Sequence, residues 1–237
     1  MRRVDADFRA KLHGAALVFF DCDGVIFDSN GFKQAAMARV IGHYPAPLRE
    51  AMTAFWRSHG GVSRRVKFGH FFRELVKDPD WEDLTEAAVQ RFGEYSLDAF
   101  RHVEPLAGAL TLMRSVGRER LVVVSGADQK ELYQVFRDKQ LEPLVSEVLG
   151  APTDKQHLVE SVLAARGVHV DEALLIGDGA RDFEVCQTLG MHFVYLHEHS
   201  EWDGAFEALA QAPNASWAKT WDDLLEAAGL AGSIDAG

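Results

Sequence analysis

The sequence predicts an α/β fold in which a Rossmann-like, doubly wound parallel sheet is interrupted by an inserted all-α domain. Three observations lead to this prediction. Short apolar runs that end in small or acidic residues recur along the chain, amphipathic stretches separate them, and one long interval contains only helical patterns. The apolar runs, which we expect to be strands, are Ala16–Phe20, Leu121–Val124, Ala173–Ile176 and His192–Leu196.

The stretches between and after these runs have apolar residues at the three- and four-residue spacing of a helix that buries one face. Glycines at positions 117, 167 and 190 follow three of these stretches, and glycine commonly ends a helix because it adopts the left-handed conformation easily. The helices predicted in this part of the chain are Leu106–Val116, Gln129–Lys139, Gln156–Ala165, Ala180–Leu189 and Asp203–Ala210.

The interval from residue 31 to residue 103 breaks the alternation, because it holds no comparable β run and is divided by prolines and glycines. Its predicted helices are Phe32–Ile41, Leu48–Trp56, Val66–Val76 and Leu84–Phe100. We therefore expect a helical cap domain at 31–103, packed over the mouth of an α/β core domain made of 1–30 and 104–237. Residues 231–237 are expected to be a frayed tail.

The composition argues against several classes of partner. A formal net charge of −11 over 237 residues disfavours binding to nucleic acid or to anionic membranes, so an anionic ligand needs a local positive site. No apolar run approaches the roughly 20 residues that span a bilayer, and the first residues indicate no export signal. Cys22 and Cys186 match no zinc or redox spacing, which fits a cytoplasmic protein.

The most informative stretch is the first predicted strand, because it ends in two carboxylates separated by one residue, Asp21 and Asp23. Ligands bind outside the carboxyl ends of strands in open α/β sheets, so we expect these two acids to lie at a ligand-binding site. Side chains at i and i+2 of an extended segment point the same way, and two like charges there need a cation or a shared proton. The alternative is that Asp23-Gly24 is only a turn.

Two further motifs contain polar residues of another kind. The predicted strand Leu121–Val124 leads to Ser125 and Gly126, a hydroxyl and an amide that suit phosphate, unless they are merely a loop before the helix cap Asp128. Lys155 opens a helix, where a cation is unfavourable by about 0.3–1 kcal/mol. We interpret Lys155 as serving an anion, although an exposed lysine at a helix start is the alternative.

A later strand again ends in acids. Asp178 and Asp182 are four residues apart and would be neighbours on a helix that begins near Gly179, where like charges repel unless they share a cation. Favourable contact with the helix dipole is the alternative, and it accounts for Asp182 better than for Asp178. Together the motifs place four acids, a hydroxyl and a lysine at successive mouths of one sheet.

In the order and kind of these motifs, the chain resembles the haloacid dehalogenase superfamily, specifically members with a helical cap after the first motif, such as phosphoglycolate phosphatases and β-phosphoglucomutases. The resemblance covers nearly the whole chain. The motifs are Asp21-Cys22-Asp23-Gly24, Ser125-Gly126, Lys155, and Gly177-Asp178 with Asp182.

The resemblance implies a phosphomonoester hydrolase, a phosphatase that acts on a small phosphorylated metabolite. It implies that Asp21 is the nucleophile that forms an aspartyl-phosphate, and that Asp23 protonates the leaving oxygen and later deprotonates water. Members that dehalogenate carbon lack an acid at the position of Asp23, so phosphoryl transfer is favoured over dehalogenation.

The resemblance also implies a cofactor and a set of ligands for it. The residues expected to hold Mg²⁺ are Asp21, Asp23 through its backbone carbonyl, Asp178 and Asp182, the last directly or through water. The residues expected to hold the phosphoryl oxygens are Ser125, Gly126 and Lys155.

In the predicted cap, a Gly-Gly pair at positions 60 and 61 precedes a cationic cluster with Arg64 and Lys67 on one helical face. We interpret His59, Arg64 and Lys67 as candidates for substrate selection, because bases there could engage a carboxylate or hydroxyls of the substrate. The alternative is a helix break, an N-cap at Ser63 and solvated charges.

The expected substrate is a small phosphate ester, either a sugar phosphate or a phosphorylated acid, and no nucleic-acid or membrane partner is expected. One alternative is a phosphomutase, which would use the same residues but protect the aspartyl-phosphate from water. Another is a regulatory domain that keeps the fold without turnover. No residue selects among the substrates or specifies an oligomeric state.

Overall fold

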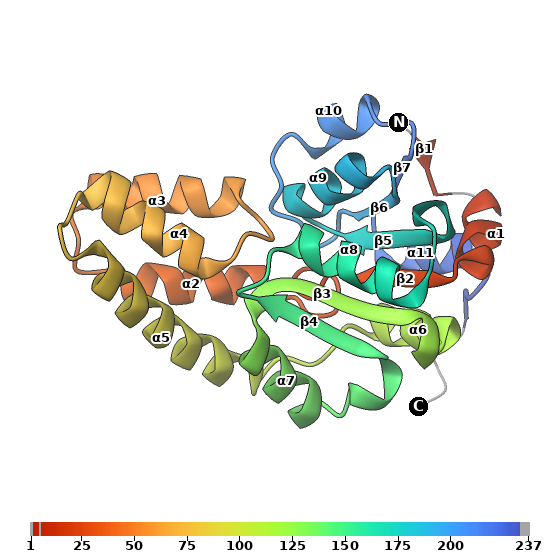
Figure 1. The fold of residues 1–237 in the computed structure, drawn as a ribbon, viewed down its shortest axis with the longest axis horizontal. Helices are drawn as coiled ribbons and strands as arrows, with labels where there is room; N and C mark the ends of the chain where they lie inside the picture. The colour runs from red at the N-terminus through yellow and green to blue at the C-terminus, as the bar shows by residue number, and fades with distance from the viewer. Residues whose placement is uncertain (1, 5, 233–237) are drawn as a thin grey trace.

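The computed structural model describes residues 2–4 and 6–232, which form a seven-stranded parallel sheet with helices on both faces and further helices beyond one edge (Figure 1). The strand order is β1-β7-β6-β5-β2-β3-β4. The strands are β1 Arg2–Arg3, β2 Leu17–Phe20, β3 Leu121–Asp128, β4 Glu147–Ala151, β5 Ala173–Gly177, β6 His192–Leu196 and β7 Ala215–Ala218. Because β2 lies between β5 and β3, a residue that follows β2 lies centrally at the carboxyl edge of the sheet.

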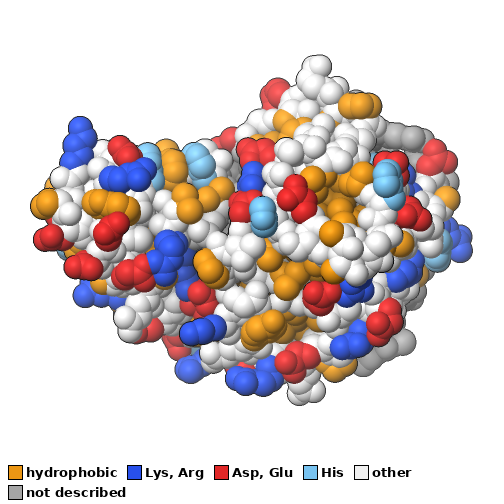
Figure 2. Space-filling view, viewed as in Figure 1, with side chains coloured by type: hydrophobic (Ala, Val, Ile, Leu, Met, Phe, Trp, Pro, Cys, Tyr) orange, Lys and Arg blue, Asp and Glu red, His pale blue; other side chains and the backbone are white. Residues whose placement is uncertain are grey.

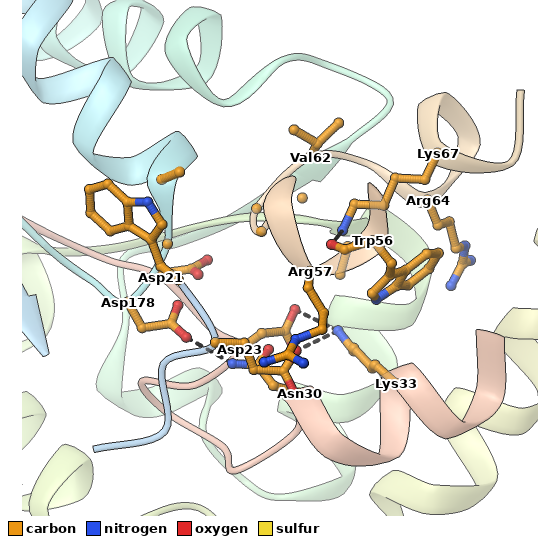
Figure 3. Close-up of a pocket in the computed structure, with 18 of the residues that line it drawn as sticks. Asp21, Asp23, Asn30, Lys33, Trp56, Arg57, Val62, Arg64, Lys67 and Asp178 are labelled. Atoms are coloured by element: carbon orange, nitrogen blue, oxygen red, sulfur yellow. Dashed lines mark hydrogen bonds and ion pairs between the residues drawn. The ribbon is translucent and has the colours of Figure 1, made fainter. Parts of the chain in front are cut away.

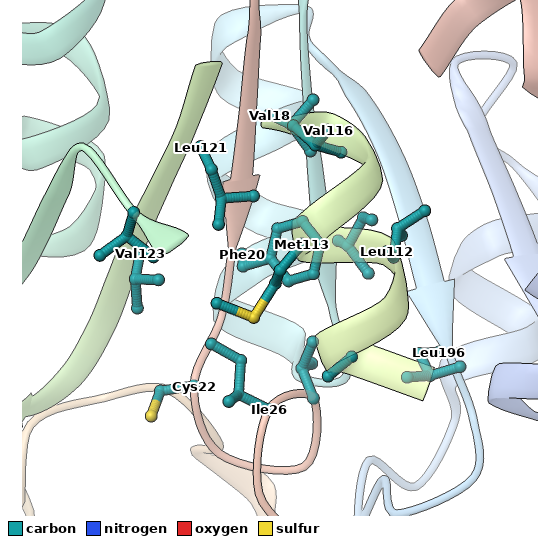
Figure 4. Close-up of a cluster of buried hydrophobic side chains, with 14 of the residues drawn as sticks. Val18, Phe20, Cys22, Ile26, Leu112, Met113, Val116, Leu121, Val123 and Leu196 are labelled. Carbon is teal, nitrogen blue, oxygen red and sulfur yellow. The ribbon is translucent and has the colours of Figure 1, made fainter. Parts of the chain in front are cut away.

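The two faces of the sheet are covered by separate hydrophobic clusters. Alternate side chains of β2 enter different clusters: Val18 and Phe20 enter one, and Leu17 and Phe19 enter the other. On the first face, shown in Figure 4, the helices are α1 Ala6–Gly14, α6 Ala107–Val116, α7 Gln129–Asp138 and α11 Trp221–Ala228. On the second they are α8 Lys155–Arg166, α9 Ala180–Leu189 and α10 Ala205–Ala210. Short 3₁₀ turns lie at η2 Arg118–Arg120, η3 Glu142–Leu144 and η4 Val170–Glu172.

The segment between β2 and α6 is a helical unit with its own apolar cluster. It consists of α2 Asn30–Val40, α3 Ala46–Ser58, α4 Arg64–His70, the π-helical η1 Phe71–Val76 and α5 Trp81–Phe100. The rings of Trp56, Phe68 and Phe92 contact one another with centroids 5.2 to 5.9 Å apart. The amide of Leu106 donates to the carbonyl of Ile26 at 2.8 Å, so the chain enters and leaves this unit at adjacent points.

The structure confirms the predicted fold class, and every predicted strand and helix is present with small shifts at the ends. Strands β1, β4 and β7 and helices α1 and α11 were not predicted from the sequence. Strand β7 reads Ala-Ser-Trp-Ala and β4 contains Gly150, so neither has the bulky apolar pattern of a buried strand. Such segments become strands because they pair with a sheet that is already formed, and this tertiary contact leaves no pattern in the local sequence. Of the tail expected at 231–237, residues 233–237 lie outside the described residues.

The surface is indented between the helical unit and the sheet, and basic and acidic side chains are interspersed on the face that Figure 2 shows. Among the helices that the structure describes, none is long and apolar enough to cross a membrane.

We expect Phe68→Ala to lower the free energy of unfolding by about 3–5 kcal/mol, because the Phe68 ring is fully buried and its removal leaves a cavity. Val66 lies on the same helix but is 57% exposed, so Val66→Ala should change the value by no more than about 0.5 kcal/mol. Urea unfolding of the two variants measures both. Equal effects would show that the aromatic cluster does not stabilise the helical unit.

Candidate active site

The site begins where β2 ends. The amide of Asp21 donates to the carbonyl of Ile176 at 2.9 Å, which continues the ladder between β2 and β5 and holds Asp21 in a buried position. The chain then turns at Gly24, where φ is +72° and where a Cβ atom would collide with the carboxylate of Asp178. Only glycine suits both the conformation and the space, so the turn brings the first and fourth motifs into contact.

Lys155 joins three motifs through its ammonium group. Its Nζ donates to Oδ1 of Asp21 at 2.8 Å and to Oδ1 of Asp182 at 2.5 Å, and all three side chains are buried. Asp154 is the N-cap of α8, so Lys155 stands at the first helical position. Burial by itself would lower the pKa of Lys155, but the carboxylates of Asp182 and Asp21 outweigh it and raise that pKa. Lys155 is therefore a permanent cation at this site.

Asp178 completes the acidic cluster. It follows β5, and its Oδ2 accepts a hydrogen bond from the side-chain amide of Asn30 at 2.8 Å. One oxygen from each of Asp21, Asp178 and Asp182 lies within 4.8 Å of the others. Burial raises the pKa of Asp21 to about 7, with Asp182 adding to this rise and Lys155 opposing it. Burial, followed by the charge of Asp21, also raises the pKa of Asp178 well above its usual range.

The charge of this cluster suits a metal cation. Three buried carboxylates face one ammonium group, and burial together with their mutual repulsion raises the pKa of two of them. Oxygen donors of this kind bind hard divalent cations. The buried acids Asp21, Asp178 and Asp182 therefore fit a metal site, and their role as metal ligands stays a prediction.

Asp23 lies in the same pocket but has different partners. Its carboxylate accepts hydrogen bonds from Ser29 Oγ and Lys33 Nζ, both at 2.5 Å, so it is bound away from the acidic cluster (Figure 3). Burial would raise the pKa of Asp23, but the Lys33 charge and the two hydrogen bonds outweigh burial and lower it. The two acids of the first motif thus have opposite pKa shifts.

The second motif lies against the helical unit. Ser125 is buried, and its hydroxyl accepts a hydrogen bond from the amide of Ala127 at 3.1 Å. A Cβ atom on Gly126 would collide with the carbonyl of Gly61, and a Cβ atom on Gly61 would lie 3.8 Å from Lys155 Nζ. Glycines on both sides thus let the loop before α4 approach the motifs of the sheet.

Asp21, Asp23, Gly126 and Asp178 line one pocket, whereas Lys155, which is buried behind them, is not among its lining residues. Figure 3 shows Asp21 and Asp178 on one side of it and Trp56, Arg64 and Lys67 on the other. The pocket therefore combines side chains from the carboxyl edge of the sheet with side chains from the helical unit.

The three cap residues named from the sequence have different surroundings. Arg64 makes a bidentate ion pair with Glu131 of α7, and its guanidinium lies 5.1 Å from the centroid of the Phe92 ring. His59 is stacked on Phe55 and is not among the lining residues of the pocket. Lys67 is buried and lines the pocket. Their role in substrate selection stays a prediction, although Arg64 is engaged by Glu131 in this conformation.

Several lining residues were not identified from the sequence, among them Asn30, Lys33 and Arg57. Lys33 lies in the first turn of α2, where a cation is unfavourable, so its position in the sequence carries the same signal as that of Lys155. Asn30 directly follows the first motif. Arg57 carries no comparable signal, because it lies on an exposed part of α3.

Solved structures with a similar fold cover nearly all of this chain. A hydrolase from Pseudomonas syringae has a TM-score of 0.69 at 18% identity, over 89% of this chain and 96% of its own. A predicted phosphoglycolate phosphatase from Haemophilus somnus 129pt has a TM-score of 0.69 at 15% identity, over 90% and 97%. YfnB from Bacillus subtilis, a predicted HAD-hydrolase in a magnesium-bound form, has a TM-score of 0.63 at 15% identity, over 91% and 99%.

No curated protein matches the chain. The family model for the haloacid dehalogenase-like hydrolases, however, matches residues 18–196. That range contains the whole acidic cluster, from Asp21 to Asp182, and all of the helical unit. The chain is therefore an enzyme of the haloacid dehalogenase-like hydrolase family.

Proposed function

We propose that this enzyme is an Mg²⁺-dependent phosphatase that hydrolyses a small phosphomonoester through an aspartyl-phosphate on Asp21. The observation that carries the proposal is the contact of Lys155 with both Asp21 and Asp182, beside Asp178, at the mouth of the sheet. This arrangement offers a nucleophile, a cation for phosphoryl oxygens and a metal site in direct contact with one another. The relative named as a predicted phosphoglycolate phosphatase supports a phosphate ester as substrate.

Asp21 is suited to attack phosphorus because its carboxylate lines the pocket and its backbone is held at the end of β2 by the hydrogen bond to Ile176. In the first step an Asp21 oxygen forms a bond to phosphorus while the bond from phosphorus to the ester oxygen breaks. In the second step water attacks the same phosphorus, which releases inorganic phosphate and restores the Asp21 carboxylate. Lys155, Ser125 and the amide of Gly126 would stabilise the charge on the phosphoryl oxygens.

Asp23 would carry the proton in both steps. It gives a proton to the departing alcohol oxygen in the first step and takes one from the attacking water in the second, so protons balance over the cycle. The bond from Lys33 lowers the pKa of Asp23, and a bound phosphate dianion would act in the opposite direction because like charges disfavour ionisation. Lys33 would thus adjust the proton affinity of Asp23.

The carboxylates of Asp21, Asp178 and Asp182, with the backbone carbonyl of Asp23, would hold Mg²⁺. When bound, the ion supplies positive charge that neutralises the phosphate and the excess of buried acids.

We also propose that residues 31–103 form a cap domain over a core domain of 1–30 and 104–237. The ion pair between Arg64 and Glu131 would then link the cap to the core.

We expect Asp21→Asn to lower kcat by about 10³-fold or more, because it removes the nucleophile with almost no change in volume. The test is phosphate release from sugar phosphates, phosphoglycolate, nucleotides and an aryl phosphate, in Mg²⁺ or in EDTA. Asp28→Asn is the matched control, since Asp28 is an exposed acid of the same loop and should not matter.

Substantial activity in Asp21→Asn would refute the assignment of the nucleophile. If the wild-type protein releases phosphate only in the presence of a sugar bisphosphate, the enzyme is a mutase. Silence across the whole panel, with the fold intact, would favour a regulatory role.

Metal binding should depend on pH. The pKa of Asp21 is about 7 in the metal-free fold and that of Asp178 is also raised, against about 3.9 in an unfolded chain. The folded state therefore binds more protons between these values, so the contribution of these two acids to metal-free stability falls as pH rises from about 4 to about 7. Mg²⁺ requires the ionised forms, and we expect it to raise Tm more at pH 8 than at pH 6.

Thermal unfolding with MgCl₂ or EDTA at the two pH values measures this difference. Asp178→Asn should reduce the Mg²⁺-dependent rise in Tm, whereas Asp28→Asn should not. An equal rise at both pH values would contradict the protonation states described above.

Lys33→Met should shift the pH profile of kcat upwards, because loss of the Lys33 charge raises the pKa of Asp23. Any limb of the profile that reports Asp23 then moves to higher pH. The control is Lys130→Met, which removes an exposed lysine from α7. A profile that is unchanged, or that moves to lower pH, would show that Lys33 does not act on Asp23.

A further inference from the structure

Lys67 is a buried cation whose ammonium group has no carboxylate partner among the described residues. Its side chain is on α4, and the residue is only 5% exposed. Nζ donates to the backbone carbonyl of Trp56 at 3.3 Å and lies 4.4 Å from the centroid of the Trp56 ring. Lys33, which lines the same pocket, and Lys155, which lies beside Asp21, are each paired with at least one carboxylate within 4 Å. Among the described residues, the ammonium group of Lys67 has a carbonyl and an aromatic ring as partners instead of a carboxylate.

A buried charge without a counter-ion is unfavourable, so this arrangement needs an explanation. Burial and, next, the charge of Lys33 lower the pKa of Lys67 to about 7, while Asp23 and Glu201 oppose the shift. If the side chain served only to fill space, methionine would fill the same space without the electrostatic cost of a buried charge. The ammonium instead lines the pocket, where an anion that enters could pair with it.

The position of Lys67 indicates which part of a ligand it would contact. Asp21 and Asp178 lie on the sheet side of the pocket, whereas Lys67 extends into it from the helical side, with Asp23 between these groups in Figure 3. Under the proposed function, phosphorus lies at Asp21 and the leaving oxygen faces Asp23. Lys67 would therefore contact the leaving alcohol rather than the phosphoryl group.

The charges on this side of the pocket indicate how many negative charges the alcohol carries. Lys33 is neutralised by Asp23, and Arg64 is neutralised by Glu131. Apart from Asp21 and Asp178 of the acidic cluster, the remaining charged side chains that line the pocket are Lys67, Arg57 and Glu201, which sum to one positive charge when Lys67 is protonated. A single negative charge balances that sum, whereas a second phosphate dianion would exceed it.

We propose that Lys67 is a specificity-determining residue that binds a carboxylate on the leaving alcohol, so that the substrate is a phosphorylated hydroxy acid. The inference rests on the proposed function for the position of the phosphate. Trp56 and Phe92 line the same pocket and would contact the short carbon skeleton. Arg57, which is exposed, would assist from the rim of the pocket.

Two ligands that differ only in the carboxylate test this proposal: phosphoglycolate, and 2-hydroxyethyl phosphate, in which a hydroxymethyl group replaces it. We expect Lys67→Met to lower kcat/KM for phosphoglycolate tenfold or more, and to change that for 2-hydroxyethyl phosphate less than threefold. Arg65→Met is the control, because Arg65 lies on the same helix but is exposed and paired with Glu86. Equal losses on both ligands, or no loss on either, would overturn the proposal.

The Tm of the ligand-free Lys67→Met variant distinguishes a ligand-binding role of Lys67 from a structural role. Because Lys67→Met removes an unpaired buried charge, Tm of the ligand-free protein should stay the same or rise. A marked fall in Tm would show that Lys67 is structural. If the Met variant does not fold, Lys67→Gln tests the same loss of charge with a polar side chain.

Binding separates this inference from the proposed function. In an Asp21→Asn background, titration calorimetry measures Kd for both ligands without turnover. A preference for phosphoglycolate that Lys67→Met abolishes would support the role of Lys67 even if no variant hydrolyses phosphate. Binding of both ligands with equal Kd before and after the substitution would overturn it, even if the enzyme is a phosphatase.

Discussion

The rest of the site depends on three buried carboxylates held beside one ammonium group. Lys155 bonds to Asp21 and Asp182, while Asp178 lies against them, and among the described residues its carboxylate accepts a side-chain hydrogen bond from the amide of Asn30 alone. Charges in this position are costly to bury unless they are paired. One lysine cannot neutralise three acids, so the folded sheet holds an excess of negative charge. Burial, together with the charge of Asp182, raises the pKa of Asp21, and the excess of acids creates the affinity for a cation.

The sheet can hold this cluster because its strands place backbone, rather than mobile side chains, around the acids. The turn at Gly24 passes directly against Asp178, and a Cβ atom on Gly177 would collide with Asp182. On the opposite side the backbones of Gly61 and Gly126 meet without side chains between them. The distance between the helical unit and the acidic cluster is therefore set by backbone contact.

The cations of the helical unit have separate electrostatic tasks. Lys33 lowers the pKa of Asp23, and Arg64 links α4 to α7 through Glu131. Lys67 is left without a carboxylate among the described residues and directs its charge into the pocket. In a chain with a formal net charge of −11, such local cations are what would attract an anionic ligand. Their division of tasks could not be read from the cluster of basic residues alone.

The sequence by itself determined the α/β class, the helical interval and the four motifs, because strand ends and helix starts place Asp21, Ser125, Lys155 and Asp178 by local rules. Tertiary structure decided the rest. Edge strands such as β4 form by pairing, and partners such as Glu131 for Arg64 are 67 residues apart in the chain. A local pattern carries the propensity of a segment and the type of a side chain, whereas charge pairing across elements exists only once the elements are packed.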